Sequence, residues 1–467
     1  SDDTTLDGFL RQIIRIEAIM ERIPAPPRRL LWRIGRCQND GHRYDAHYRK
    51  YEHHAHASGH AHAYSGKMAA SATRALLRDR HPLRERTGNM MLSPSRGLSL
   101  LIICAQTVIA DEVPIESAIP DIKQLEADGA IIHEVILDKR NIFDLSDPKE
   151  NKWLYRWANR LHIVTRDSVI YNQLLFRPGD TFSSRLLEES ARILRANRFI
   201  IDASIEPVSD KGDIVNINVI TQDVWSLTPD ISFSRSGGEN TAAVGIEETN
   251  LFGRGQLLRL KWIDGVDRTS TRFDFEDRNL GSSWVSAFLR IADNSDGKTN
   301  FVSVVRPFHA LDARWTAGGR VATDDRRTSL YRLGEETAEY RHERDYHTAF
   351  GGLSGGLKNG WVRRWSAGVV YDDNRFSEAM NPGLPAVIPE DRKLVYPFLN
   401  LEILEDDFDT SSNANQIGRT EDFFMGRRLT ASLGWADTSL DADRDALIFS
   451  ASANSGFGSL DKTALLL

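Results

Sequence analysis

From Trp225 to the end of the chain, the sequence alternates apolar and polar residues in runs of about ten, without helical periodicity. Such a period of two predicts β-strands with one apolar and one polar face. The clearest run is Leu311–Val321. Its apolar face is predicted to carry Leu311, Ala313, Trp315, Ala317 and Val321, and its polar face Asp312, Arg314, Thr316 and Arg320.

A soluble β-sandwich and an outer-membrane β-barrel both alternate in this way, but they differ in which face meets water. Two features favour the barrel. Expected turns alternate between short ones, such as Asn279–Ser283, and long ones, such as Ser377–Arg392. Aromatic residues recur near expected strand ends, as interfacial girdles require: Trp225, Trp262, Trp284, Trp315, Trp361, Trp365, Tyr371 and Trp435. We therefore predict an antiparallel transmembrane β-barrel of roughly a dozen strands over residues 224–467.

Residues 90–110 have the three parts of a secretory signal peptide. Arg96 gives the positive region, Leu98–Cys104 the apolar region, and Val108 and Ala110 the small residues before a cleavage site. A buried core helix is the alternative. Cleavage there predicts a mature chain from Asp111 without cysteine, which suits an oxidising periplasm. Residues 1–89, rich in Arg and His, are predicted to be a non-native or disordered extension.

The charge balance makes nucleic acid an unexpected partner. Residues 111–467 carry 42 Lys and Arg against 56 Asp and Glu, a net charge of −14, so this part of the chain offers no strongly basic balance.

Residues 111–223 are predicted to form a small periplasmic α+β domain. Strand Ile131–Leu137, with a further strand at Leu161–Thr165, precedes two helices at 168–175 and from about Ser183 to Ala196. Strands Phe199–Val208 and Ile214–Thr221 follow, joined by the turn residues 209–212.

This order of elements, with LLFRPGDTF (174–182) and LRANRFI (194–200) at the joints, resembles a POTRA domain. The stretch from Thr221-Gln-Asp-Val-Trp225 through Gly237-Gly238 to Asn250-Leu-Phe-Gly-Arg-Gly255 resembles the passage into the barrel in the BamA/TamA family of outer-membrane proteins. Barrels of that family have about sixteen strands, so the dozen expected here predict an incomplete barrel.

The resemblance implies an outer-membrane protein that inserts or translocates polypeptides, with its N-terminal domain in the periplasm. Implied partners are unfolded outer-membrane or secreted polypeptides, the lipid bilayer and lipopolysaccharide. A periplasmic or inner-membrane protein could also bind the POTRA domain. Three alternatives remain open: a two-partner-secretion-type channel, a passive outer-membrane channel, and a membrane anchor without transport activity.

The predicted binding site is the edge of strand Phe199–Val208, where a client strand would add by main-chain hydrogen bonds at Ile201, Ser204 and Ile205. No catalytic, cofactor or metal residues are expected. Gly352-Leu-Ser354-Gly-Gly356 has the nucleophile-elbow spacing, but no His follows His347, so we interpret it as glycine in packed strands. Asp293–Gly297 is interpreted as a hairpin loop rather than a calcium loop.

Overall fold

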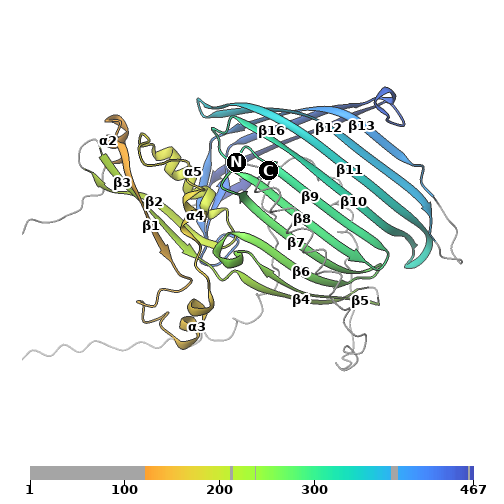
Figure 1. The fold of residues 1–467 in the computed structure, drawn as a ribbon, viewed down its shortest axis with the longest axis horizontal. Helices are drawn as coiled ribbons and strands as arrows, with labels where there is room; N and C mark the ends of the chain where they lie inside the picture. Colours follow the sequence, from red (N-terminus) through yellow and green to blue (C-terminus); the bar gives the residue numbers. More distant parts are fainter. Residues whose placement is uncertain (1–120, 211–213, 237, 380–387, 461–462, 467) are drawn as a thin grey trace, which may run out of the picture.

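The computed structural model describes residues 121–210, 214–236, 238–379, 388–460 and 463–466. The predicted extension at 1–89 and the predicted signal peptide at 90–110 lie outside these residues. The described chain forms a small α+β domain and a long antiparallel sheet, with the domain at one end of the strands (Figure 1). Among the described residues, no helix is long and apolar enough to cross a membrane.

The α+β domain is built on a three-stranded sheet in the order β1-β3-β2. Strand β1 runs parallel to β3, and β2 runs antiparallel to it. The strands are β1 (Ile131–Arg140), β2 (Ile200–Asp210) and β3 (Ile214–Asp223), and the helices are α2 (Ile122–Ala127), α3 (Trp153–Leu161), α4 (Asp167–Tyr171) and α5 (Ser184–Arg195). The predicted order of strand, two helices and two strands is thus present, with α3 inserted after β1. The strand predicted at Leu161–Thr165 is wrong, because Leu161 ends α3 and the next residues have no regular structure.

The core of this domain follows from the sequence periodicities. Strand β3 buries every second residue, from Val215 to Asp223. Helix α5 buries Leu187, Ala191 and Leu194 on one stripe, and these pack against the sheet. This confirms the helix predicted from about Ser183 to Ala196.

The second part is a thirteen-stranded antiparallel sheet whose order follows the chain, except that β14 and β15 form a separate hairpin. The predicted fold class, an α+β domain followed by the antiparallel sheet of a β-barrel of roughly a dozen strands, is confirmed. Within the described residues, β4 and β18 are the two edges of this sheet. Its strands are β4 (Leu227–Ser236), β5 (Glu239–Glu248), β6 (Gln256–Asp264), β7 (Thr269–Leu280), β8 (Val285–Asn294), β9 (Gly297–Arg306), β10 (Trp315–Arg332), β11 (Glu335–Lys358), β12 (Trp361–Glu378), β13 (Arg392–Glu405), β16 (Arg427–Ala436), β17 (Ala446–Ser459) and β18 (Thr463–Leu466); the separate pair is β14 (Phe408–Ser412) and β15 (Thr420–Phe424).

One face of the long sheet exposes apolar side chains. Leu399, Leu433 and Phe449 pair across β13, β16 and β17, and are 49%, 52% and 65% exposed. Strands β4 and β5 continue this pattern, since Ile231 pairs with Val244 and both are exposed. The structure therefore presents a broad apolar surface outward.

On the other face, charged side chains form ion pairs. Asp274 on β7 is fully buried and accepts hydrogen bonds from Arg259 at 3.0 Å and Arg290 at 2.7 Å. Glu402 on β13 is likewise bound by Arg364 at 3.0 Å and by Arg428. A buried carboxylate is tolerated only when it is paired in this way. The sheet is thus polar inside and apolar outside.

The first four residues of the clearest alternating run, 311–314, lie outside the strand. Leu311 and Ala313 precede β10, which begins at Trp315, and both are buried. The Leu311 N–H bonds to Glu189 of α5, and Leu311 packs with Val362 and Leu404. The strand therefore begins later than the alternation predicts, at Trp315, after the residues that contact the α+β domain. From Trp315 onward the predicted faces hold, with Trp315 and Val321 exposed and Thr316 buried.

Candidate functional site at the domain junction

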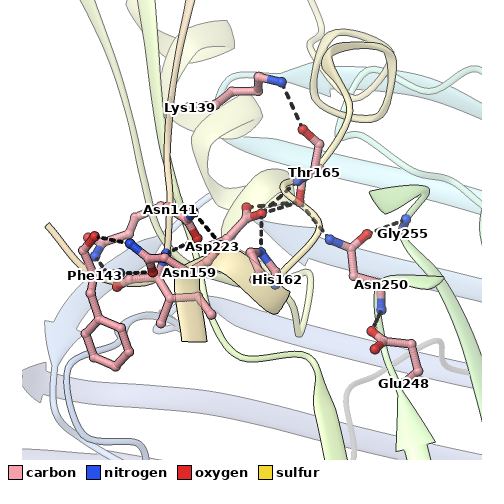
Figure 2. A network of polar contacts seen from close by, with 12 residues as sticks. Lys139, Asn141, Phe143, Asn159, His162, Thr165, Asp223, Glu248, Asn250 and Gly255 are labelled. Atoms are coloured by element: carbon pink, nitrogen blue, oxygen red, sulfur yellow. Dashed lines mark hydrogen bonds and ion pairs between the residues drawn. The ribbon is translucent and has the colours of Figure 1, made fainter. Parts of the chain in front are cut away.

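A buried polar network joins the α+β domain to the first strands of the long sheet (Figure 2). At its centre is Asp223, the last residue of β3, which is 2% exposed. One carboxylate oxygen accepts hydrogen bonds from the Thr165 N–H at 2.8 Å and lies 2.9 Å from His162 Nε2. The other accepts the Thr165 hydroxyl at 2.9 Å. Both oxygens of a buried carboxylate are thus satisfied, as its burial requires.

The network continues into the turn between β5 and β6. Asn250 Nδ2 donates to the Thr165 hydroxyl at 2.9 Å, and Asn250 Oδ1 accepts the Gly255 N–H at 2.7 Å. The Asn250 side chain therefore links the two parts of the molecule while closing its own turn. The two sequence motifs around Asp223 and Asn250 meet through Thr165, which precedes Asp223 by 58 residues.

Glycine is required at the point where this turn meets the α+β domain. Gly253 has a φ of +71°, and a Cβ built on it would lie 2.7 Å from the Val164 carbonyl oxygen. The Arg166 N–H donates to the Gly253 carbonyl at 2.9 Å. Any larger side chain at this position would push the two backbones apart.

Helix α5 makes a second junction with the turn segments at the same end of the long sheet. Arg195 binds Asp422 of β15 through two nitrogens, at 2.8 and 2.5 Å. The Arg192 guanidinium lies 3.6 Å from the centre of the Phe408 ring. Arg419 donates back to the carbonyls of Arg195 and Asn197. The α+β domain is thus held both at the first strands and at the β14–β15 hairpin.

Glu189 lies on the same helix and is only 3% exposed. It accepts the Leu311 N–H at 2.7 Å and an Arg185 nitrogen at 3.0 Å, while Arg185 also binds Asp312. Burial raises the pKa of Glu189 above its ordinary value, because the carboxylate loses water that these partners replace only in part. Burial also lowers the pKa of Arg192 beside it.

The predicted client-binding strand is β2, and it lies at an edge of its sheet, as predicted. Its outward main chain is partly occupied. The Ala203 N–H donates to Asp202 Oδ1 at 2.9 Å, and the Ala203 carbonyl accepts from Arg195 at 2.7 Å. Because the N–H and C=O of one residue point the same way in an antiparallel strand, and neighbours alternate, the Ser204 N–H faces β3 and that of Ile205 faces outward.

The side chains of β2 also depart from strict alternation. A bulge between Ile200 and Asp202 puts Ile200 in the core, fully buried, in place of Ile201. Ile201 instead approaches the β14–β15 hairpin, where a Cβ on Gly418 would lie 3.5 Å from Ile201 Cδ1. Ala203 and Ile205 pack on the core face. Whether Ile201, Ser204 and Ile205 contact a client stays a prediction.

The other motifs are structural. Ser354 lies inside β11, and a Cβ on Gly352 would lie 2.5 Å from the Trp365 carbonyl, which agrees with glycine in packed strands. Asp293–Gly297 spans the hairpin between β8 and β9, as interpreted. Among the described residues, no group of three or more His, Cys, Asp and Glu is placed to hold a metal ion.

No protein-family model matches the chain, and no curated protein matches it either. Among solved structures, the chain is similar to BamA from Haemophilus ducreyi lacking POTRA domains 1–3, with 13% identity over 70% of this chain and 78% of that one and a TM-score of 0.31. It is also similar to CdiB from Acinetobacter baumannii, with 10% identity, 73% and 66% coverage and a TM-score of 0.27. For CdiB from Escherichia coli these values are 9%, 70%, 69% and 0.29. TM-scores this low carry no argument about the function of this chain.

Proposed function

We propose that this chain is an outer-membrane protein of the BamA/TamA type, which inserts or translocates polypeptides from the periplasm. The membrane location rests on one observation: the long sheet exposes its apolar face and buries its charged face. Leu433 and Phe449 are exposed on one face, whereas Asp274 and Glu402 are buried in ion pairs on the other. Such a sheet is stable when lipid covers its apolar face and the polar face lines a lumen.

The role in handling polypeptides rests on two strand edges. Strand β2 is an edge of the domain sheet, and β4 is an edge of the long sheet within the described residues. An edge strand can bind an extended polypeptide through its free main-chain groups. On β2 the outward groups of Ala203 are occupied, which leaves those of Ile205 as the proposed contact.

The effect of a proline in β2 depends on which way the N–H that it removes points. A proline at Ser204 would remove an N–H that points at β3, so it would damage the domain sheet itself. A proline at Ile205 would remove the outward N–H. The variant Ile205→Ala loses a similar part of the side chain but keeps that N–H, and is the matched control.

The decisive experiment is site-specific crosslinking in cells. A photoreactive residue would replace Ser204 on β2, Phe233 on β4, or Leu433 in the interior of the long sheet. Phe233 and Leu433 share the exposed apolar face, so only the edge position differs. We expect adducts with unfolded outer-membrane or secreted polypeptides at Ser204 and Phe233 but not at Leu433.

The alternatives give different results. If the protein is a passive channel or a membrane anchor, neither Ser204 nor Phe233 forms adducts with polypeptides. A secretion channel gives an adduct with one secreted polypeptide at Ser204 and none at Phe233. Absence of adducts at both edges would exclude the proposed polypeptide-handling role.

A further inference from the structure

Helix α3 attaches to the α+β domain through its polar side. Asn159 Nδ2 donates to the Phe143 carbonyl at 2.8 Å, and Asn159 Oδ1 accepts the Phe143 N–H at 3.1 Å (Figure 2). Tyr155, one turn earlier, stacks on the Phe143 ring with 4.2 Å between ring centres. These two residues fix which side of the helix faces inward.

The apolar side of α3 therefore faces outward. Trp153, Leu154, Trp157 and Leu161 are 73%, 49%, 54% and 51% exposed, and no residue of this helix is buried. They fall on one stripe, because their spacing of three and four residues follows the helical period. A helix on a soluble domain turns such a stripe toward the core, so this helix is inverted.

The same helix carries basic but no acidic side chains. Arg156 and Arg160 lie beside the apolar stripe, whereas the segment before the helix carries Lys149 and Lys152 together with Asp147 and Glu150. An apolar stripe with tryptophan, bordered by positive charges, is the composition of helices that lie in the headgroup region of a bilayer. It complements a surface of anionic phospholipid.

The residues next to α3 are also apolar and exposed. Ile163, just past the helix, is 54% exposed and abuts the β5–β6 turn, where a Cβ on Gly253 would lie 3.3 Å from its Cγ2. In that turn Phe252 is 59% exposed. Leu227, which begins the outward face of β4, is exposed as well. Apolar side chains thus extend from the long sheet, across the turn, to α3.

We propose that α3 is an interfacial helix that binds the anionic phospholipid surface on the periplasmic side of the membrane, beside the first strands of the long sheet. This inference rests on the membrane location proposed above. The His162–Asp223 and Thr165–Asn250 contacts, directly after α3, would then hold the α+β domain at a fixed orientation to the bilayer. Tryptophan is suited to this depth, because its ring is apolar and its N–H can remain hydrated.

Depth-dependent quenching in reconstituted full-length protein tests the proposal. Single cysteines would be introduced as Trp157→Cys, Leu433→Cys or Lys123→Cys in a chain carrying Cys37→Ser and Cys104→Ser, and labelled with an environment-sensitive fluorophore. Lys123 is exposed on α2, at the far end of the domain from the long sheet (Figure 1). Vesicles of phosphatidylethanolamine and phosphatidylglycerol would carry nitroxides near the headgroup or near the chain end.

We expect the label at Trp157 to shift to the blue and to be quenched mainly by the headgroup nitroxide. The label at Leu433 should be quenched mainly by the deep nitroxide, and the label at Lys123 by neither. Replacing phosphatidylglycerol with phosphatidylcholine, or introducing Arg160→Gln, should reduce quenching at Trp157 and leave Leu433 unchanged.

The outcomes separate this inference from the proposed function. Quenching at Leu433 without quenching at Trp157 overturns the interfacial helix and leaves the membrane location intact. A label at Trp157 that is shielded from aqueous iodide but insensitive to both nitroxides means that protein, not lipid, covers α3. Absence of quenching at both positions overturns the membrane location itself.

Discussion

The α+β domain and the long sheet hide opposite kinds of side chain. The domain buries Phe176, Leu194 and Val219 in its core and leaves its charges mostly outside. The long sheet exposes Leu433 and Phe449 and buries Asp274 between arginines. Both parts use the same strand alternation, so the period-2 pattern specifies two faces without saying which face meets water.

The two arrangements are favourable in different solvents. Apolar area left in water is unfavourable, and a charge buried without partners is more so. In the long sheet the charges have partners, such as Glu402 with Arg364, while the apolar residues have none on the outward side. An apolar environment around that face makes the exposure of these apolar side chains favourable. Helix α3 extends the outward apolar pattern onto the domain.

The sharpest test of this contrast is a pair of neighbouring substitutions in β16. Leu433 faces outward and Ser432 faces the polar side, where it pairs with Asn400 and Ser450. Leu433→Arg should cost about 2–4 kcal/mol in lipid, because a charge is placed in the bilayer. Ser432→Arg should be nearly neutral, since it joins a polar face. Urea unfolding in liposomes measures both, and equal costs would contradict the assigned faces.

A smaller effect is expected at the junction, where the two regions meet. Thr165→Val keeps the shape of the side chain but removes a hydroxyl that donates to Asp223 and accepts from Asn250. Leaving these buried groups unsatisfied should cost about 1–3 kcal/mol. The loss should appear as greater protease sensitivity between the two parts, with the long sheet intact.

The exposed Thr181 supplies the control for this prediction. Thr181→Val makes the same chemical change on the surface and should leave protease sensitivity unaltered. If Thr165→Val behaves like Thr181→Val, the network does not hold the two regions together.

Much of the fold was predictable because local patterns agree with the tertiary structure. Helix α5 follows from its apolar stripe, and the faces of β16 follow from Leu429, Leu433 and Trp435. The start of β10 was predicted wrongly. Leu311 is not part of the strand, because its N–H donates to Glu189, which is 122 residues away in the chain. Helix α3 was missed, although the spacing of Trp153, Trp157 and Leu161 follows the helical period and could have indicated it.

The junction shows what a single sequence does not reveal. The segments around Asp223 and Asn250 stood out as motifs, but nothing in them indicated that they meet. His162 and Thr165, which complete the contact, lie in the segment that was predicted as a strand, so their role in the junction was not indicated. Likewise, the bulge that replaces Ile201 by Ile200 in the core of the domain has no local sequence cause that we can identify.

The smallest expected effect concerns the pH dependence of the contact between α5 and the long sheet. Burial raises the pKa of Glu189, so the folded state binds its proton more tightly than the unfolded state does. The stability contributed by that proton is fully present below the ordinary pKa and is lost as pH rises through the raised one. Glu189→Gln, which stays neutral, should therefore flatten the pH profile of stability. Glu188→Gln, on the exposed side of the same helix, is the control and should keep the original profile.

The slope of stability against pH is measured by urea unfolding of the full chain in vesicles, followed by tryptophan fluorescence. The measurements cover the pH range between the ordinary and the raised pKa of Glu189. An unchanged slope in Glu189→Gln would mean that the contact with Leu311 and Arg185 fully replaces the lost hydration, and that this buried carboxylate does not sense pH.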